Sequence, residues 1–287
     1  MDHLIWREQP NLRNPMLVAA FEGWNDVAEA ASDAAVWLIQ EYSGRAVAGI
    51  DPEEFVNFQE QRPRIRLQDG VTRQLQWPGN EFYALELPDA ERDLVVLLGI
   101  EPHNRWRTFT ETVIDAAGAL GCTELVTFGA LLADAPHTRE PNVTGIGADD
   151  TLQRRLELSP SSYEGPTGIV GVLHDTWRRH DRRATSLWVA VPHYIATPPN
   201  PVAIRALLSR FDRLGQLGMD LRELDAQVLA WRERVDAIVA DDEEAREYVE
   251  RLEQEADEAE QLSDVAIPSG DAIAAELEAF LRNRDEQ

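Results

Sequence analysis

Short apolar runs alternate with helical patterns over the first three quarters of this chain, and this alternation limits its fold more than any other feature. Four runs read as buried strands because each is short, apolar and bounded by polar residues, glycine or proline. They span residues 16–21, 93–99, 124–132 and 186–191. One helical pattern ends near residue 42, and three more occupy residues 106–120, 167–180 and 200–217. Strands that alternate with helices build a sheet covered on both faces, so the sequence predicts one α/β domain with a mostly parallel sheet.

Three further segments are strand candidates. Residues 45–50 follow the first helical pattern and predict a right-handed strand–helix–strand unit with residues 16–21. Residues 73–77 and 82–87 are the other two, and the second alternates well enough to pair antiparallel with the first. The expected sheet is therefore mixed, with a parallel centre.

The last quarter of the chain shows a helical repeat. Its apolar residues step by three and four, which is a heptad seam. The seam consists of Leu224, Val228, Trp231, Val235, Ile238, Ala245, Val249, Leu252, Ala256 and Ala259. Asp242 interrupts it, and Asp241 with Glu244 has the form of a capping box, so we expect two helices that break near residues 240–242. A short helix from Asp271 to Arg282 is expected to follow.

We place a domain boundary at residue 219, between an α/β core (1–219) and a helical extension (220–287). Two arrangements of the extension stay open. Its seam packs on its own domain, or it forms a coiled coil between chains; the short length favours the first.

Negative charge is concentrated in the extension. Residues 220–287 hold 22 acidic and 7 basic residues, against 30 and 20 in residues 1–219. Such a field repels nucleic acid, whose binding depends on phosphate neutralisation. We therefore expect a basic protein, and no nucleic acid, as the partner of this acidic tail.

All 27 basic residues are arginine. Without lysine, no Schiff base with pyridoxal phosphate can form and no phosphate-loop lysine exists. The single cysteine, Cys122, reads as a core residue in a reducing compartment and excludes a Cys-rich zinc site. No apolar run approaches the ~20 residues of a membrane span, and no secretory signal is visible. We expect a cytoplasmic protein without membrane contact, metal or cofactor.

Three histidines follow a proline directly after predicted strands. His103 and His137 stand in Pro-His-x-Arg segments with Arg105 and Arg139, and the third is His193. Proline ends strand pairing, and open α/β sheets bind ligands at the carboxyl ends of their strands. A guanidinium beside an imidazole suits a carboxylate or phosphate. The pattern predicts an anion-binding site, provided that these segments meet around one hollow.

Carboxylates and glycine loops extend the candidate site. Glu22 and Asp26 lie in the loop after the first strand, and Glu101 precedes the first Pro-His pair. Each carboxylate can orient a histidine, act as a base or bind a metal. Residues 144–147 and 163–168 are glycine loops whose backbone N–H groups favour an anion. Structural roles are the more frequent outcome for all these residues.

These motifs occur in one order over residues 15–220. They are Phe21-Glu22-Gly23-Trp24-Asn25-Asp26, Gly99-Ile100-Glu101-Pro102 with Arg105-Trp106, Pro136-His137-Thr138-Arg139, Tyr163-Glu164-Gly165-Pro166-Thr167-Gly168 and Val191-Pro192-His193-Tyr194. With this set the chain resembles the bacterial and archaeal branch of the proteasome assembly chaperone 2 family, in its long actinobacterial type. Trp24, Tyr163 and Thr167 belong to these segments and complete the candidate site.

The resemblance implies a three-layer α/β/α fold similar to the phosphorylase/hydrolase-like fold, and self-association, for which we favour a trimer. Two functions stay open. The first is a non-catalytic assembly chaperone or scaffold that presents its acidic tail to a partner. The second is a small-molecule enzyme or binder, nucleoside phosphorylase-like or hydrolase-like, in which Arg105 and Arg139 grip an anion. No Gly-x-Ser-x-Gly elbow or His-Glu-x-x-His helix is present, and we favour the first.

Overall fold

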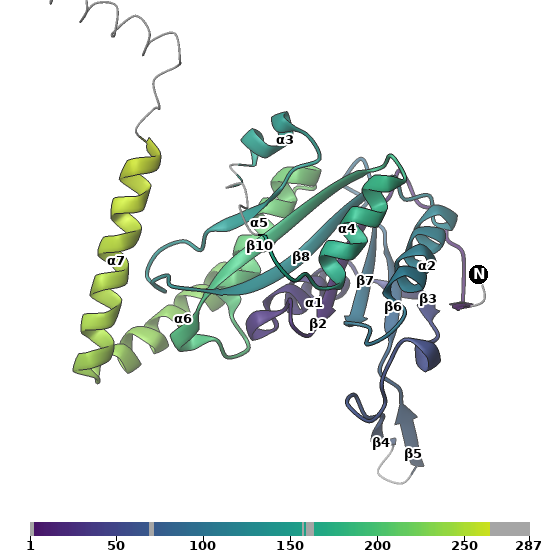
Figure 1. Ribbon diagram of the computed structural model, residues 1–287, viewed down its shortest axis with the longest axis horizontal. Helices are drawn as coiled ribbons and strands as arrows, with labels where there is room; N and C mark the ends of the chain where they lie inside the picture. Colours follow the sequence, from purple (N-terminus) through teal and green to yellow (C-terminus); the bar gives the residue numbers. More distant parts are fainter. Residues whose placement is uncertain (1–2, 69–71, 157, 159–163, 265–287) are drawn as a thin grey trace, which may run out of the picture.

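A computed structural model describes residues 3–68, 72–156, 158 and 164–264 (Figure 1). The described chain centres on an eight-stranded sheet with the strand order β1-β3-β6-β7-β2-β8-β10-β9. Its strands are β1 (Leu4–Trp6), β2 (Met16–Glu22), β3 (Arg45–Ile50), β6 (Asn80–Leu85), β7 (Leu94–Ile100), β8 (Glu124–Ala133), β9 (Val143–Ile146) and β10 (Arg183–Pro192). A separate hairpin consists of β4 (Arg64–Gln68) and β5 (Thr72–Gln76).

The helices lie mostly between the strands along the chain, as the alternation predicted. They are α1 (Ala30–Glu41), α2 (Trp106–Ala119), α3 (Asp150–Arg155), α4 (Ile169–Arg179), α5 (Pro201–Gly215), α6 (Arg222–Ala240) and α7 (Glu243–Asp264). The described residues also form three short 3-10 helices: η1 (Val27–Glu29), η2 (Pro52–Glu54) and η3 (His193–Ile195). In the described chain no helix combines the length and apolar character that a bilayer-spanning helix needs.

The centre of the sheet is parallel. β2 pairs in parallel with β7 and β8, and β8 pairs in parallel with β10. Every residue of β2 except Glu22 is buried, which explains why this strand reads as a continuous apolar run and not as an alternating one. The flanks are antiparallel: β6, β3 and β1 follow β7 on one side, and β9 follows β10 on the other.

The strand–helix–strand prediction for residues 16–50 is right in direction, but the two strands are not neighbours in the sheet. Two successive antiparallel pairings, β7 with β6 and β6 with β3, make β3 run in the same direction as β2. However, β6 and β7 lie between them. β7 is buried over most of its length and takes the central place beside β2, whereas β3 begins with exposed Arg45 and lies nearer the edge.

The predicted pairing of residues 73–77 with 82–87 is wrong. β5 pairs with β4, a strand that was not among the predicted ones, while β6 pairs with β3 and β7. All of β5 is exposed, so no apolar face draws it into the main sheet, whereas β6 buries Phe82, Ala84 and Leu85.

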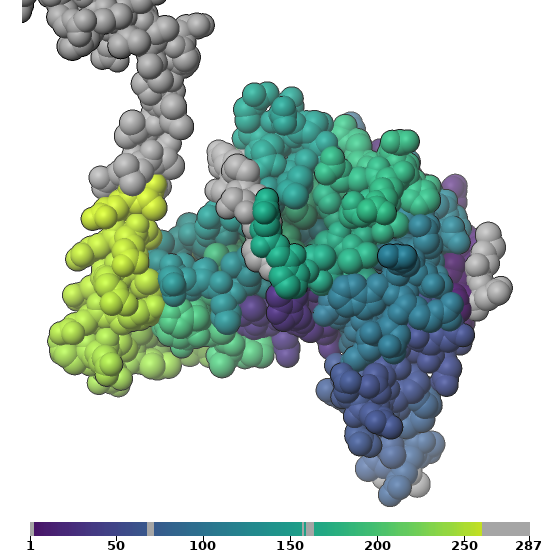
Figure 2. All heavy atoms as spheres, in the orientation of Figure 1, coloured from purple at the N-terminus to yellow at the C-terminus, as the bar shows by residue number. Residues whose placement is uncertain are grey.

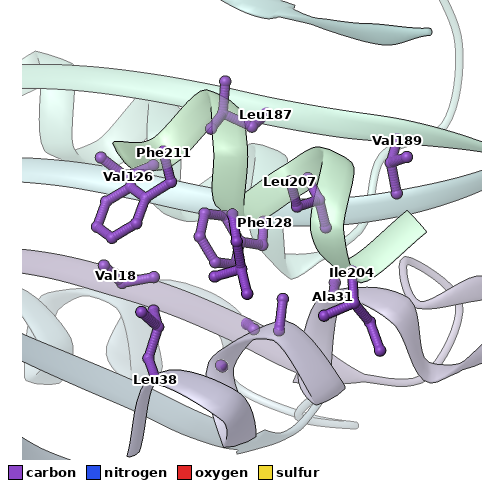
Figure 3. Close-up of a cluster of buried hydrophobic side chains, with 14 of the residues drawn as sticks. Val18, Ala31, Leu38, Val126, Phe128, Leu187, Val189, Ile204, Leu207 and Phe211 are labelled. Atoms are coloured by element: carbon purple, nitrogen blue, oxygen red, sulfur yellow. The ribbon is translucent and has the colours of Figure 1, made fainter. Parts of the chain in front are cut away.

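Helices cover both faces of the sheet, so the fold has three layers, α/β/α (Figure 1). On one face, side chains of β2, β8 and β10 pack against α1 and α5; Figure 3 shows Phe128 of β8 beside Phe211 of α5, with ring centroids 5.4 Å apart. On the other face, α2 and α4 contribute Phe109 and Trp177. Cys122 is buried in this second cluster, and burial raises its thiol pKa to about 12.

The helical extension follows the predicted break. α6 packs on α5 and buries Leu224, while Val228, Trp231 and Val235 form a small cluster with Val202. The predicted seam member Ile238 is 70% exposed, whereas the later members Val249 and Leu252 are buried, so the seam is interrupted at Ile238. α7 begins after Asp242, whose carboxylate accepts the N–H groups of Glu244 and Ala245, so Asp242 caps the helix and not Asp241. The helix predicted for residues 271–282 lies outside the described residues, and the boundary at residue 219 stays a prediction.

Candidate functional site

The first Pro-His-x-Arg segment contacts η2 and the residues that follow it. The His103 N–H donates to the Phe55 carbonyl at 2.7 Å, and His103 Nε2 lies 3.5 Å from Glu60 Oε2. Arg105 forms an ion pair with Glu54 and precedes α2 with a left-handed φ of 55°. The Arg105 guanidinium is therefore committed to Glu54, next to the exit of β7, whereas the buried His103 Nδ1 has no hydrogen-bond partner among the described residues.

The second segment faces the helical extension. The His137 side chain is 1% exposed, and its Nε2 lies 3.0 Å from Asp236 Oδ1 on α6. Its Nδ1 lies 2.7 Å from the Tyr194 hydroxyl, which also accepts the His137 backbone N–H at 2.8 Å. Each ring nitrogen of His137 therefore has a hydrogen-bond partner, and which atom donates at each of them depends on the tautomer of the ring. Burial raises the pKa of Tyr194 to about 12, which keeps its proton in place.

Arg139 binds α7 through a forked contact. Its Nε and one terminal nitrogen donate to the two oxygens of Asp257 at 2.8 and 2.9 Å, and the other terminal nitrogen donates to Glu253 at 3.3 Å. The neighbouring Thr138 hydroxyl also donates to Glu253. The hydrogen bonds from Arg139 lower the pKa of Asp257. Bidentate geometry of this kind fixes orientation as well as charge.

His193 completes the contact with α7. Its Nδ1 lies 3.2 Å from Asp134 Oδ1, and its Nε2 lies 3.2 Å from the Tyr248 hydroxyl on α7. The rings of His193, Tyr194 and Tyr248 pack edge to face in pairs, with centroids 5.6 to 5.9 Å apart. We call α6 and α7 the arm, and we call the contacts that His137, Arg139, His193 and Tyr194 make with it the arm clasp.

The structure therefore brings His137, Arg139 and His193 together, but not with His103 and Arg105. In the described chain these two sets share no hydrogen-bond or ion-pair partner. The pairing of β8 with β2 stops at Thr127, whereas the pairing of β8 with β10 continues to Ala133. The carboxyl ends of β8 and β10 therefore extend beyond the centre of the sheet and toward the arm (Figure 1).

An apolar groove of about 700 Å³ lies between α4 and the strands β8, β10 and β9. Trp24 and Val27, from the loop after β2, line one side, and Thr167 and Val170 line another. After β2 the chain passes over one face of the sheet as α1. After β8 it passes over the opposite face as α4. The groove therefore lies where open α/β sheets bind ligands. Two predicted site residues, Trp24 and Thr167, belong to it.

Glu101 and Asp26 support this groove from behind. Glu101 Oε1 accepts the Ile169 N–H at 2.8 Å and the Asn25 side-chain amide at 3.0 Å, so one carboxylate joins the loop after β2 to the start of α4. Asp26 is buried and accepts the N–H groups of Ala31 and Ser32, which orders the start of α1. Burial raises the pKa of Asp26 although these hydrogen bonds oppose the shift.

Three carboxylates surround that loop: Glu22, Glu29 and Asp33, which we call the acidic cluster. In the described residues none of them forms an ion pair; Arg64 is the cation whose charge reaches Glu22. Partial burial and the charges of Glu29, Asp26 and Glu22 raise the pKa of Asp33 to about 6. Partial burial and the charges of Asp26 and Glu29 raise the pKa of Glu22, against the opposing charge of Arg64. This surface holds negative charge that is poorly neutralised.

Comparison with known proteins decides the family. The profile of the PAC2 family matches residues 20–239. The chain belongs to the PAC2 family. A PAC2 family protein from Streptomyces avermitilis is 42% identical, with a TM-score of 0.76, over 82% of this chain and 99% of that one. A proteasome-assembly chaperone homologue from Mycobacterium tuberculosis is 41% identical over the same shares, also with a TM-score of 0.76.

More distant structures share the fold of this PAC2 chain. A Corynebacterium glutamicum protein of unknown function is 20% identical over 90% of this chain and 98% of that one, with a TM-score of 0.82. The archaeal proteasome activator PbaB from Pyrococcus furiosus is 20% identical over 83% and 99%, with a TM-score of 0.64. No curated protein matches the chain.

The structure corrects one predicted part of the site, the glycine loop at residues 144–147, and does not describe another, Tyr163. Residues 144–147 do not form an anion-binding loop, because most of them belong to β9; the Ile146 N–H donates to the Ser186 hydroxyl and the Gly147 N–H to Gln153. Tyr163 lies outside the described residues.

The sequence pattern does not predict a role for one histidine of the groove. His174 lines the groove, is only 8% exposed, and its Nε2 has no hydrogen-bond partner in the described chain. Burial lowers the pKa of this imidazole. Its spacing of four from Val170 on the same helix face was the available signal. In the described residues no group of three His, Cys, Asp or Glu side chains forms a metal site.

Proposed function

We propose that this PAC2 protein is a non-catalytic assembly chaperone or scaffold of the cytoplasm, which self-associates, as a trimer, through its α/β core and offers its acidic arm to a protein partner. Family membership supports an assembly role. A relative that is 41% identical is described as a proteasome-assembly chaperone homologue, so proteasome components are the first partners to test.

The arm clasp is the observation that carries this proposal. The imidazoles and the guanidinium that an enzyme would use as acid, base and anion clamp are bound to Asp236, Tyr248 and Asp257 of the arm. Both ring nitrogens of buried His137 are occupied, so this histidine has no lone pair left for a substrate proton. These side chains support a role in holding a helical arm at a set angle.

The outer surface of α7 suits a basic partner. This helix contains ten acidic residues and two arginines among 22 residues. Its exposed acidic side chains include Glu243, Glu247, Glu250, Glu255 and Glu258. A surface whose charges all have one sign speeds association with an oppositely charged partner, and high salt removes this effect.

Affinity capture with the full chain tests the proposal. A variant with Glu247, Glu250 and Glu258 changed to Gln is compared with a control in which exposed Glu41, Glu91 and Asp115 become amides. We expect the arm variant to lose its captured partners from a native lysate and the control to keep them. Partners that are retained by both variants, or that resist 0.5 M salt equally, would count against a role of the acidic arm.

A small-molecule site is the second candidate, and the groove favours it because about 700 Å³ is the volume of an ordinary ligand site. It ranks second because Arg105 and Arg139 already pair with Glu54 and Asp257. Thermal shift with nucleosides, phosphate and short peptides tests it: a ligand at a hundred times its dissociation constant adds about 2.7 kcal/mol to the unfolding free energy. Absence of a shift would remove this candidate.

A further inference from the structure

The hairpin β4–β5 projects from the body (Figure 1), and one of its faces carries exposed apolar side chains. Ile65 lies opposite Leu75, and Leu67 lies opposite Arg73, so these four side chains share one face. Ile65 and Leu67 are each 62% exposed, and Leu75 is 48% exposed. An isolated two-stranded hairpin is marginal in water, and a cluster of exposed large apolar side chains marks an interaction surface.

The hairpin is also basic. Its described strands contain Arg64, Arg66 and Arg73 and no acidic residue. Arg66 and Arg73 form no ion pair with any described residue. Trp77, directly after β5, is 52% exposed and contacts Phe58 with ring centroids 4.8 Å apart. The surface therefore offers apolar side chains with a cation among them.

The groove beside α4 has the complementary properties. Four large apolar side chains at it are exposed: Trp24 by 65%, Leu132 by 54%, Ile146 by 45% and Leu131 by 39%. Among the described residues, no acidic or arginine side chain lines the groove. The loop that supplies Trp24 lies within the acidic cluster, whose carboxylates repel one another.

The described hairpin residues do not line the groove of their own chain. In the orientation of Figure 2, the hairpin (blue) projects below the body, while the loop after β2 (purple) lies at the surface next to the segment that leads into α4 (green). Each copy therefore exposes both an apolar basic element and an apolar groove with an acidic border.

We propose that the hairpin β4–β5 of one copy docks by its apolar face into the α4 groove of a second copy, with Arg73 facing Glu29 and Asp33 and with Arg66, on the opposite face of the hairpin, adding to its positive charge. This proposal rests on the self-association in the proposed function and names the surfaces that would produce it. Contact between two different patches is head to tail, and such contacts close into a ring when the rotation between copies permits. One interface then covers both uncovered apolar surfaces of every chain and neutralises the acidic cluster.

Charge reversal on the full chain tests the proposal by native mass spectrometry and light scattering. Arg66→Glu with Arg73→Glu, and separately Glu29→Arg with Asp33→Arg, are each expected to turn the assembly into monomers. The chain with all four substitutions regains complementary surfaces and is expected to assemble again. Arg107→Glu with Arg234→Glu is the control for the same change of charge on exposed arginines elsewhere. Circular dichroism checks that each variant is folded.

An apolar variant separates the two parts of the interface. Leu67→Ser keeps every charge and is expected to weaken assembly about tenfold or more, because it removes an apolar anchor. If the wild type assembles but the charge variants or Leu67→Ser assemble equally well, or if the fourfold variant stays monomeric, this interface is wrong while self-association stands. A wild type that is monomeric at all concentrations would overturn the interface and the self-association together.

Discussion

His137 Nε2 lies 3.0 Å from Asp236 Oδ1, which joins a buried imidazole at the exit of β8 to a carboxylate on α6, 99 residues later. The other ring nitrogen, Nδ1, lies 2.7 Å from the Tyr194 hydroxyl oxygen. A histidine held from both sides orients two elements and has no free nitrogen for chemistry. This relationship explains why a motif typical of binding sites serves here as an attachment point.

Replacement of His137 by Phe should lower the free energy of unfolding by about 2 kcal/mol, because the Tyr194 hydroxyl and the partly buried Asp236 contact lose their partner. Urea unfolding measures the loss. The matched control is His180→Phe, since His180 is exposed and contacts exposed Glu111. Equal effects of the two substitutions would show that the His137 contacts contribute nothing special.

Replacement of Arg139 by Lys should loosen α7 although the charge is kept. An ammonium is a point charge that cannot donate to both oxygens of Asp257 as the guanidinium fork does. Limited proteolysis in α7 should therefore become faster in Arg139→Lys than in the wild type. Arg179→Lys, which changes an exposed pair with Asp175 on α4, is the control. An unchanged cleavage rate in Arg139→Lys would show that charge alone holds the helix.

Replacement of Asp33 by Asn should stabilise the protein above pH 6. The folded pKa of Asp33 is about 6, above its ordinary 3.8, so the folded carboxyl is penalised when ionised and relieved as the pH falls through 6. At pH 8 the gain should be about 1 kcal/mol after allowance for solvent screening, and it should vanish near pH 4. Unfolding curves at both pH values measure it; a gain that grows toward pH 4 has the wrong sign for this account.

Replacement of Gly168 by Ala should destabilise the start of α4 by about 2 kcal/mol. The added Cβ would lie 2.4 Å from the Asn25 amide and 2.7 Å from Glu101 Oε1, where the loop after β2 joins α4. Gly79→Ala is the control, because its Cβ would have only the Ile50 carbonyl nearby, at 3.9 Å. Thermal unfolding compares the two, and equal melting temperatures would contradict the tight contact at Gly168.

The sequence predicted the buried strands β2, β7, β8 and β10 because burial on both faces leaves continuous apolar runs. The pattern did not give strand order: β6 and β7 separate β3 from β2, and that choice depends on burial across the whole sheet. β4 escaped notice because it buries nothing in the sheet and pairs with β5 alone.

The residues of the predicted site lie in two separate places for a similar reason. The sequence identified His137, Arg139 and His193 as special, but their partners lie far away in the chain, 118 residues away for the pair Arg139 and Asp257. Nothing local selects Asp236 or Asp257 among the 22 acidic residues after residue 219. His103 and Arg105 have the same local motif, yet their strand exit faces η2 and not the arm, so the motif alone could not separate the two roles.

Native-state hydrogen exchange of α7 tests the central claim, that these side chains fasten the arm to the core. The measurement compares the wild type with a variant that combines His137→Gln, Arg139→Ala and His193→Gln. We predict that amides of α7 exchange at least about tenfold faster in the variant, because local opening of α7 no longer has to break the contacts of the arm clasp. Amides of β8 and β10 should keep their exchange rates. Unchanged exchange in α7 would contradict it.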